Sequence, residues 1–237
     1  MIIHWHWDGS KERVKLGMTR RDAIILAGGK GVRIGNTAKA FLHLNEKTLI
    51  ELILETIQPL VYHIIVVIGR NDSMEKFREK IPRSIDVFRD RGKGEGTLVG
   101  LLNGLNRSKS EYSLVLPCDS PFISIEVLEL LFTEALGVDA AIPQWPNGFI
   151  EPLHSVYKTD GARNAARRAL KNGMKVSGMI ERLKDVRYVP IEVIGKIDPE
   201  LLTFTNINTL GDLRKASRIY SRLLARRRKV GSIWKAP

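Results

Sequence analysis

Short apolar runs alternate along the chain with longer segments whose apolar residues recur at helical spacing. The clearest runs are residues 23–27 (AIILA), 64–68 (IIVVI) and 112–116 (YSLVL). Their length and composition are typical of parallel strands buried on both faces. Between the first two runs, residues 48–58 place leucines and isoleucines three and four residues apart, which predicts an amphipathic helix. The same signals predict further strands over 85–88 and 139–142 and further helices over 72–80, 97–106 and 124–136.

Strands that alternate with helices favour one fold class. Each strand–helix–strand unit closes through a right-handed crossover and adds a parallel strand to the sheet. We therefore expect an α/β fold with three layers, α/β/α, around a mostly parallel, Rossmann-like sheet. The alternation changes after Trp145, where residues 149–157 and 186–193 are expected as strands separated by a helical stretch over 158–183. A long helix is expected from Thr209 onward.

The central part of the chain contains no linker rich in proline, glycine and serine, so residues 18–212 are expected to form a single domain. Residues 1–17 are either an N-terminal extension or the product of a misassigned start, with Met18 as the original initiator. Residues 213–237 are expected to form a basic helix or tail.

Charge is distributed unevenly along the chain. Its 237 residues carry 38 lysines and arginines against 26 acidic residues, a net charge of +12. Such an excess suits nucleic acid, an anionic membrane or a phosphorylated small molecule as partner. Nine of the basic residues lie in residues 213–237, which hold no acidic residue. Residues 1–212 then hold 29 basic and 26 acidic residues, a net charge of only +3.

Several classes of protein are not expected from the composition. Cys118 is the only cysteine, which excludes an intramolecular disulfide and indicates the reducing cytoplasm. No apolar run reaches membrane-spanning length, and the polar first residues do not resemble a signal peptide. Apart from His4 and His6, the histidines lack the paired spacing of zinc ligands. We therefore expect a cytoplasmic protein that uses neither a membrane nor zinc.

A glycine-rich loop follows the first predicted strand, with the sequence LAGGKGVRIG over residues 26–35 and Lys39 shortly after it. Glycines let the backbone approach phosphates closely, and consecutive N–H groups form an anion-binding nest. Lys30 and Arg33 add positive charge within the loop. The loop matches neither the P-loop nor the GxGxxG dinucleotide motif. A tight turn on a basic surface is the alternative, but the interleaved basic residues favour phosphate binding.

Two further loops follow other predicted strands. Residues 90–100 (DRGKGEGTLVG) suit a lid or a wall against a nucleotide base, although a surface loop would have the same composition. Residues 116–122 (LPCDSPF) place Asp119 at the end of a buried strand, where it could hold Mg²⁺ against phosphates or serve a local turn. Cys118 is expected to be a packing residue rather than a nucleophile. Ligands of open α/β sheets bind at these strand ends, so the fold would gather the three loops.

These loops, together with EPL at 151–153 before Tyr157 and FTNINT at 204–209, resemble the nucleotidyltransferase superfamily. More narrowly, the chain resembles the molybdenum cofactor guanylyltransferase (MobA-like) family. The resemblance implies a sheet of the nucleotide-diphospho-sugar transferase type and Mg²⁺ as cofactor. It also implies transfer of GMP from GTP to the phosphate of molybdopterin or the molybdenum cofactor, with release of pyrophosphate.

The resemblance also implies roles for individual residues. Lys39 would bind the phosphates, Asp119 would coordinate Mg²⁺, and Asn208 would be the second metal ligand unless it serves a turn or caps the next helix. Lys39, Asp119 and Arg33 are the expected catalytic residues, with Arg33 neutralising pyrophosphate. The expected nucleotide-binding residues are Leu26, Ala27, Gly28, Gly29, Lys30, Gly31, Lys39, Asp90, Gly96 and Asp119.

Two alternatives remain open at this stage. The same chemistry could serve another acceptor, such as adenosylcobinamide phosphate, a phospholactate-type precursor or a sugar phosphate, or could use CTP as donor. The basic C-terminal segment could instead bind nucleic acid. Its arginines at 218, 222 and 226 repeat every four residues, opposite a modest apolar set. That pattern equally fits a helix that lies on the body, on a second copy of the chain or on a partner protein.

Overall fold

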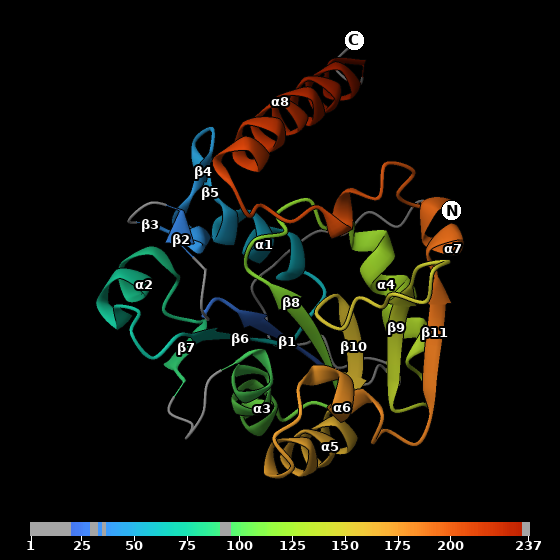
Figure 1. Ribbon diagram of the computed structural model, residues 1–237. Helices are drawn as coiled ribbons and strands as arrows, with labels where there is room; N and C mark the ends of the chain where they lie inside the picture. The colour runs from blue at the N-terminus through green and yellow to red at the C-terminus, as the bar shows by residue number, and fades with distance from the viewer. Residues whose placement is uncertain (1–19, 29–32, 35–36, 91–95, 234–237) are drawn as a thin grey trace.

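The computed structural model describes residues 20–28, 33–34, 37–90 and 96–233. Its centre is a seven-stranded sheet with the order β11-β9-β10-β8-β1-β6-β7 (Figure 1). Only β10 runs antiparallel to its neighbours within this sheet, and the other pairings are parallel. The strands are β1 (Arg21–Leu26), β6 (His63–Ile68), β7 (Asp86–Arg89), β8 (Tyr112–Pro117), β9 (Ala140–Gln144), β10 (Ser155–Lys158) and β11 (Val186–Pro190).

Helices cover both faces of the sheet, which confirms the three-layer α/β/α fold (Figure 1). Strand β1 shows how one sequence serves both layers, because its side chains alternate between the faces. Ala23 and Ile25 pack into one core, and Ile24 and Leu26 pack into the other. The first face carries α1 (Leu49–Ile57), α2 (Met74–Lys80), α4 (Ile125–Glu134) and α7 (Ile191–Gly195), and the second carries α3 (Thr97–Arg107), α5 (Thr159–Lys171) and α6 (Val176–Ile180).

Between β1 and α1 the chain forms two small hairpins that the hydrophobic pattern did not predict. A 3-10 turn, η1 (Lys39–Phe41), lies between them. The second hairpin leads into α1 through Thr48, which forms a reciprocal capping box with Glu51. The hairpin strands are β2 (Arg33–Ile34), β3 (Thr37–Ala38), β4 (His43–Leu44) and β5 (Lys47–Thr48).

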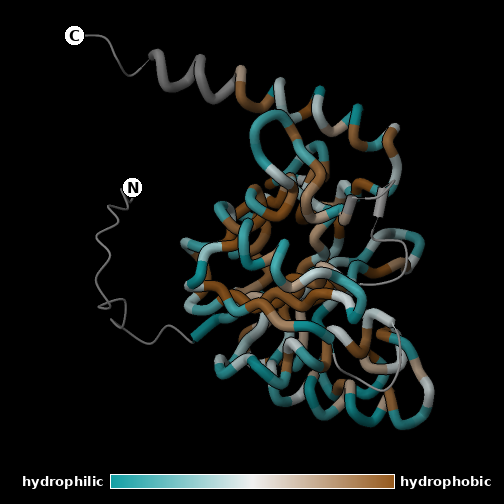
Figure 2. The backbone as a smooth tube through the Cα atoms, turned by 90° about the vertical axis from the view of Figure 1, so that its left-hand side faces the viewer, coloured by the Kyte–Doolittle hydropathy of each residue, from teal (hydrophilic) through white to brown (hydrophobic). Residues whose placement is uncertain are grey.

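The last helix, α8 (Leu210–Ile233), is the long helix expected from Thr209, and it extends beyond the layers of the sheet (Figure 1). Its first half packs on a third, smaller core through Leu213, Ala216 and Ile219. Arg222 forms an ion pair with Glu200 on the body. The backbone tube, seen from a second direction, shows this helix leaving the body at one end (Figure 2). None of the helices within the described ranges is long and apolar enough to cross a membrane.

Three predicted boundaries were wrong, each because of a proline or a glycine. Strand β10 starts at Ser155 rather than 149, since the prolines at 146 and 152 hold the preceding residues in a hairpin loop. Strand β11 ends at Pro190, after which α7 begins. The helical stretch over 158–183 is split into α5 and α6 near Gly173, whose φ of 66° belongs to the left-handed region.

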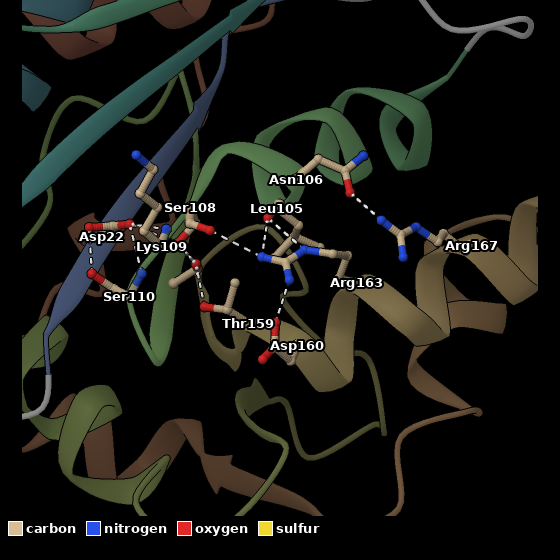
Figure 3. A network of polar contacts seen from close by, with 11 residues as sticks. Asp22, Leu105, Asn106, Ser108, Lys109, Ser110, Thr159, Asp160, Arg163 and Arg167 are labelled. Atoms are coloured by element: carbon tan, nitrogen blue, oxygen red, sulfur yellow. Dashed lines mark hydrogen bonds and ion pairs between the residues drawn. The ribbon is translucent and has the colours of Figure 1, made fainter.

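A polar network fastens the sheet at the edge opposite the carboxyl ends of the parallel strands (Figure 3). The carboxylate of Asp22, 1% exposed, accepts hydrogen bonds from the hydroxyls of Ser108 and Ser110 at 2.8 and 2.6 Å. Arg163 on α5 donates to the carbonyl oxygens of Leu105 and Ser108 at distances of 2.8–3.0 Å. The network ties β1, α3, the turn before β8 and α5 together, and thereby holds the helical layer in register with the sheet.

Candidate active site

The chain reverses its direction of travel across the sheet between β1 and β8. From β1 it moves to β6 and β7 on one side, and then β8 returns to the other side of β1. Such a switch point opens a crevice beyond the carboxyl ends of the strands. A cavity of about 1130 Å³ lies there. Gly28 lines it after β1, Asp119 after β8 and Asn208 before α8, so segments distant in sequence meet at one place.

Lys39 is the centre of the site. Its Nζ donates to Asp119 Oδ2 at 3.0 Å and to Asn208 Oδ1 at 2.5 Å. The side chain of Lys39 is only 6% exposed and that of Asp119 is 16% exposed. Such a buried ammonium group is held in position by its two oxygen partners, because a buried charge that loses its partners costs much free energy.

The backbone explains why Asp119 and Asn208 meet. The Cys118 N–H donates to the Leu26 carbonyl at 3.1 Å, which continues the pairing of β8 with β1 by one residue. The Ile207 N–H then donates to the Asp119 carbonyl at 2.9 Å. The segment before α8 is thereby held against the end of β8, which brings the Asn208 amide to the carboxylate.

Asn208 does not cap α8, so one of the two alternative roles that its sequence position left open, the helix cap, is wrong. The cap is Thr209, whose hydroxyl accepts from the Asp212 N–H at 3.1 Å. Asp212 in turn accepts from the N–H groups of Asn208 and Thr209. Hydrogen bonding with the Thr209 side chain, and then with these two N–H groups, lowers the pKa of the Asp212 carboxyl. The side chain of Asn208 is therefore left to face Lys39.

One half of the cavity lies over β1, β6 and β7. Here Gly28 approaches the turn after β6 so closely that an added Cβ would lie 2.1 Å from Gly69 N. The Gly69 N–H donates to Asp72 at 2.8 Å, which shapes this turn. Asp90, at the end of β7, accepts from the Asn103 amide at 2.6 Å. This half thus combines two closely packed glycines with fixed polar groups, which suits a nucleotide.

The other half lies over β8 and the hairpin loop that joins β9 to β10. Glu151 and His154 line the cavity there. Trp145 Nε1 donates to Glu151 Oε1 at 2.9 Å, and His154 Nδ1 lies 3.6 Å from Glu151 Oε2. Both rings pack edge-on against Phe204, with centroids 6.0 and 5.4 Å away. A carboxylate therefore faces the cavity from a rigid aromatic support.

Cys118 also lines the cavity but is 1% exposed. Burial, and then the neighbouring Asp119 charge, raise the pKa of its thiol far above the ordinary value. A thiol that keeps its proton is a poor nucleophile. This agrees with its expected packing role.

The structure brings together most of the predicted site residues that it describes. Those that line the cavity are Leu26, Gly28, Lys39, Asp90, Gly96, Asp119 and Asn208. Ala27 is buried beside it, and its N–H donates to the Val67 carbonyl at 2.8 Å. Gly29, Lys30 and Gly31 lie outside the described residues, as does the side chain of Arg33 on β2.

Glu151, His154 and Asn206 also line the cavity, although the sequence predicts no role for them. The EPL motif was a signal for Glu151, but its chemistry was not visible in the sequence. Asn206 accepts a hydrogen bond of 2.5 Å from the Ser120 hydroxyl and so adds a second link between the two segments that hold Asp119 and Asn208.

A mostly parallel sheet with a crevice at its switch point, a close glycine approach on one side and a lysine–aspartate–asparagine cluster in the middle is the arrangement expected of a nucleotidyltransferase. Comparison with known proteins agrees with this class. The sequence model described as the MobA-like NTP transferase domain matches residues 23–186, and the chain belongs to this family.

Relatives share most of their length with this chain. A protein of Methanosarcina mazei named "Probable molybdenum cofactor guanylyltransferase" is 39% identical over 81% of this chain and 88% of the relative. The crystal structure of molybdopterin-guanine dinucleotide biosynthesis protein A from Archaeoglobus fulgidus superposes with a TM-score of 0.72 and 34% identity, covering 85% of this chain and 99% of that one. A 4-diphosphocytidyl-2C-methyl-D-erythritol synthase from Anaerococcus prevotii, 16% identical, covers 86% of this chain and 96% of its own with a TM-score of 0.64, and shares the fold.

Proposed function

We propose that this nucleotidyltransferase moves GMP from GTP to the terminal phosphate of molybdopterin or the molybdenum cofactor and releases pyrophosphate. The names of the M. mazei and A. fulgidus relatives support the donor and the acceptor. The observation that carries the proposal is the contact of Lys39 with both Asp119 and Asn208 inside a cavity large enough for two substrates.

The reaction is an in-line displacement at phosphorus. An oxygen of the acceptor phosphate forms a bond to the α-phosphorus of GTP, and the bond to the β-phosphate oxygen breaks, so that pyrophosphate leaves with the electron pair. The acceptor phosphate is already ionised at neutral pH, so this step needs no general base. The chain has to position the reactants and to neutralise charge, and the Lys39 ammonium is the buried cation placed to do so.

The cluster also has donors that suit Mg²⁺. No group of three or more histidine, cysteine or acidic side chains in the described ranges could hold a metal by itself. Magnesium, however, prefers oxygen ligands and is commonly held by one or two side chains together with substrate phosphates. Asp119 and Asn208 supply two such oxygens, converging on one cationic group. Bound there, Mg²⁺ would stabilise negative charge on the phosphates.

The rest of the predicted site completes the proposal. The loop of Gly28, Gly29, Lys30 and Gly31, with Leu26 and Ala27 before it, would bind the nucleotide, with Asp90 and Gly96 beside the nucleoside. Arg33 would neutralise the leaving pyrophosphate. Cys118 is free and buried, which fits work in the reducing cytoplasm.

Ligand-induced thermal stabilisation tests the donor. A ligand that binds only the folded state raises the melting temperature, so GTP with Mg²⁺ should stabilise the chain more than CTP, UTP or ATP. Pyrophosphate release then tests the acceptor, with molybdopterin compared against adenosylcobinamide phosphate, a phospholactate and a sugar phosphate. Release with molybdopterin and GTP supports the proposal, whereas release only with another pair refutes it.

A further inference from the structure

Glu151 has no part in the displacement, yet its carboxylate faces the cavity. Its side chain is 15% exposed, and the hairpin loop fixes its backbone. The Glu151 N–H donates to the Pro143 carbonyl at 3.0 Å, and its carbonyl accepts from the His154 N–H at 3.0 Å and the Ser155 hydroxyl at 2.6 Å. Since a negative charge in a triphosphate site repels the substrate, such a rigidly held carboxylate needs another explanation.

The carboxylate has unused hydrogen-bonding capacity. An ionised carboxylate offers about four lone pairs, and Trp145 Nε1 uses one of them at 2.9 Å. His154 Nδ1, at 3.6 Å, is beyond hydrogen-bond distance. His154 is 2% exposed, and neither of its ring nitrogens has a hydrogen-bond partner in the described part of the chain. The group is thus held on one side and ready to accept hydrogen bonds from a ligand on the other.

The place of Glu151 in the fold indicates which substrate it meets. Gly28 and Asp90 line the half of the cavity over β1, β6 and β7, whereas Glu151 follows β9, on the far side of β8. Asp119, at the end of β8, lies between these halves in the strand order. Phe149 lines the cavity on the Glu151 side, and although apolar it is 60% exposed. An exposed aromatic ring beside a carboxylate offers a planar ligand both stacking and hydrogen bonds.

We propose that Glu151 is a specificity-determining residue that binds the ring of the acceptor. Its carboxylate would accept from two adjacent N–H donors of a 2-amino-4-oxopyrimidine ring, the ring type that pterins contain. Trp145 is a positioning residue, because its Nε1 holds the carboxylate and Trp145 is not among the residues that line the cavity. This inference rests on the part of the proposed function that makes a pterin phosphate the acceptor. It does not rest on the transfer of GMP.

Binding of two matched probes by the full chain tests the inference. The probes are 6-hydroxymethylpterin monophosphate and its lumazine counterpart, in which an oxygen replaces the 2-amino group and removes the adjacent donor pair. Both fluoresce, so their Kd values can be measured by titration, and the Kd of GTP is measured alongside. The variants are Glu151→Gln, Trp145→Phe, which keeps a ring against Phe204 but loses the donor, and the control Glu46→Gln on an exposed turn.

The wild-type chain should bind the pterin probe at least tenfold more tightly than the lumazine probe, since buried acceptors discriminate strongly against a ligand that lacks the donors. Glu151→Gln should abolish this preference, since charge-assisted hydrogen bonds to a carboxylate are stronger than those to a neutral amide. The Kd of GTP should stay within about twofold of the wild-type value. Trp145→Phe should reduce the preference, and Glu46→Gln should keep it. A preference that survives in Glu151→Gln, equal wild-type binding of the two probes, or a loss of GTP binding instead, overturns the inference.

Transfer to molybdopterin separates this inference from the proposed function. If wild type and Glu151→Gln transfer GMP with the same KM for the acceptor, the inference fails while the proposed function stands. If the pterin preference depends on Glu151 but no GMP is transferred, the proposed function fails while the inference stands.

Discussion

Replacing Asp119 with asparagine keeps the shape of the side chain and removes its charge. In the wild type, Lys39 donates to Asp119 at 3.0 Å and to Asn208 at 2.5 Å, and its side chain is 6% exposed. After Asp119→Asn, the ammonium keeps two oxygen acceptors, but neither of these two acceptors carries a negative charge. The change therefore isolates charge from packing.

The loss of stability should be moderate. A hydrogen bond to a charged group contributes about 1.5–3 kcal/mol, and removal of one partner from a fully buried ion pair costs about 3–5 kcal/mol. Asp119 borders the cavity and is 16% exposed, so water and the remaining amide offset part of this cost. We expect a loss of about 1–3 kcal/mol, or roughly 2–4 °C of melting temperature per kcal/mol in a chain of this size.

The loss of activity should be much larger. Removal of one preorganised electrostatic group from an active site typically lowers kcat about 10²–10³-fold. Pyrophosphate release measured at a temperature where the variant stays folded checks this. Asp160→Asn is the matched control, because Asp160 pairs with Arg163 on the surface of α5 and is not among the residues that line the cavity. If folded Asp119→Asn keeps more than about a tenth of wild-type activity, the assignment of Asp119 is wrong.

Three further predictions concern the frame around the site. Gly28→Ala places a Cβ 2.1 Å from Gly69 N. The overpacking should lower the free energy of unfolding by about 1–3 kcal/mol and reduce the thermal stabilisation by GTP. An unchanged melting curve with full stabilisation by GTP would contradict the close approach of the two glycines. Asp22→Ala leaves four donor groups without their acceptor. It should lower the free energy of unfolding, measured by urea titration, by about 3 kcal/mol and leave the affinity for GTP unchanged. A loss below about 0.5 kcal/mol would show that the network does not hold the layers together. Hydrogen bonds from Thr48 lower the pKa of Glu51 below its ordinary 4.5, so its contribution is present above that pH and lost as pH falls through the lower folded pKa. The melting-temperature advantage of wild type over Glu51→Gln should shrink below about pH 4.5, and an advantage independent of pH would contradict this.

The main strands and helices were predictable because their hydrophobic patterns are unambiguous. Strands β1, β6 and β8 are each built around a short, buried and mainly apolar run. Ser124 caps α4 by accepting from the Val127 N–H at 3.3 Å. The hairpins before α1 were not predictable, because strands of two residues carry no periodicity. The antiparallel direction of β10 was not predictable either. A short connection between strands indicates an antiparallel pair, but the connection after β9 looks short only if the residues around Pro146 and Pro152 are assigned to a loop.

The site was predictable where its residues follow strands. Asp119 and the glycine loop stand at strand ends, and a parallel sheet collects such positions at one edge. The contact of Lys39 with Asn208 joins residues 169 apart in sequence, which no local pattern encodes. The proposed role of Glu151 was invisible for a different reason. It depends on the hydrogen bond from Trp145 to the carboxylate and on the packing of Phe204 against the rings of Trp145 and His154, which no local pattern encodes.

The fate of the α-phosphate of GTP tests the central claim most directly. GTP labelled at the α-phosphate is incubated with Mg²⁺, molybdopterin and either wild type or Asp119→Asn, and the label is followed by chromatography. We predict that wild type transfers the label to a guanine dinucleotide of the pterin while unlabelled pyrophosphate leaves, and that Asp119→Asn transfers it about 10²–10³-fold more slowly. Label that remains in GTP or appears in GDP with wild type, or equal transfer by the two proteins, would contradict the account.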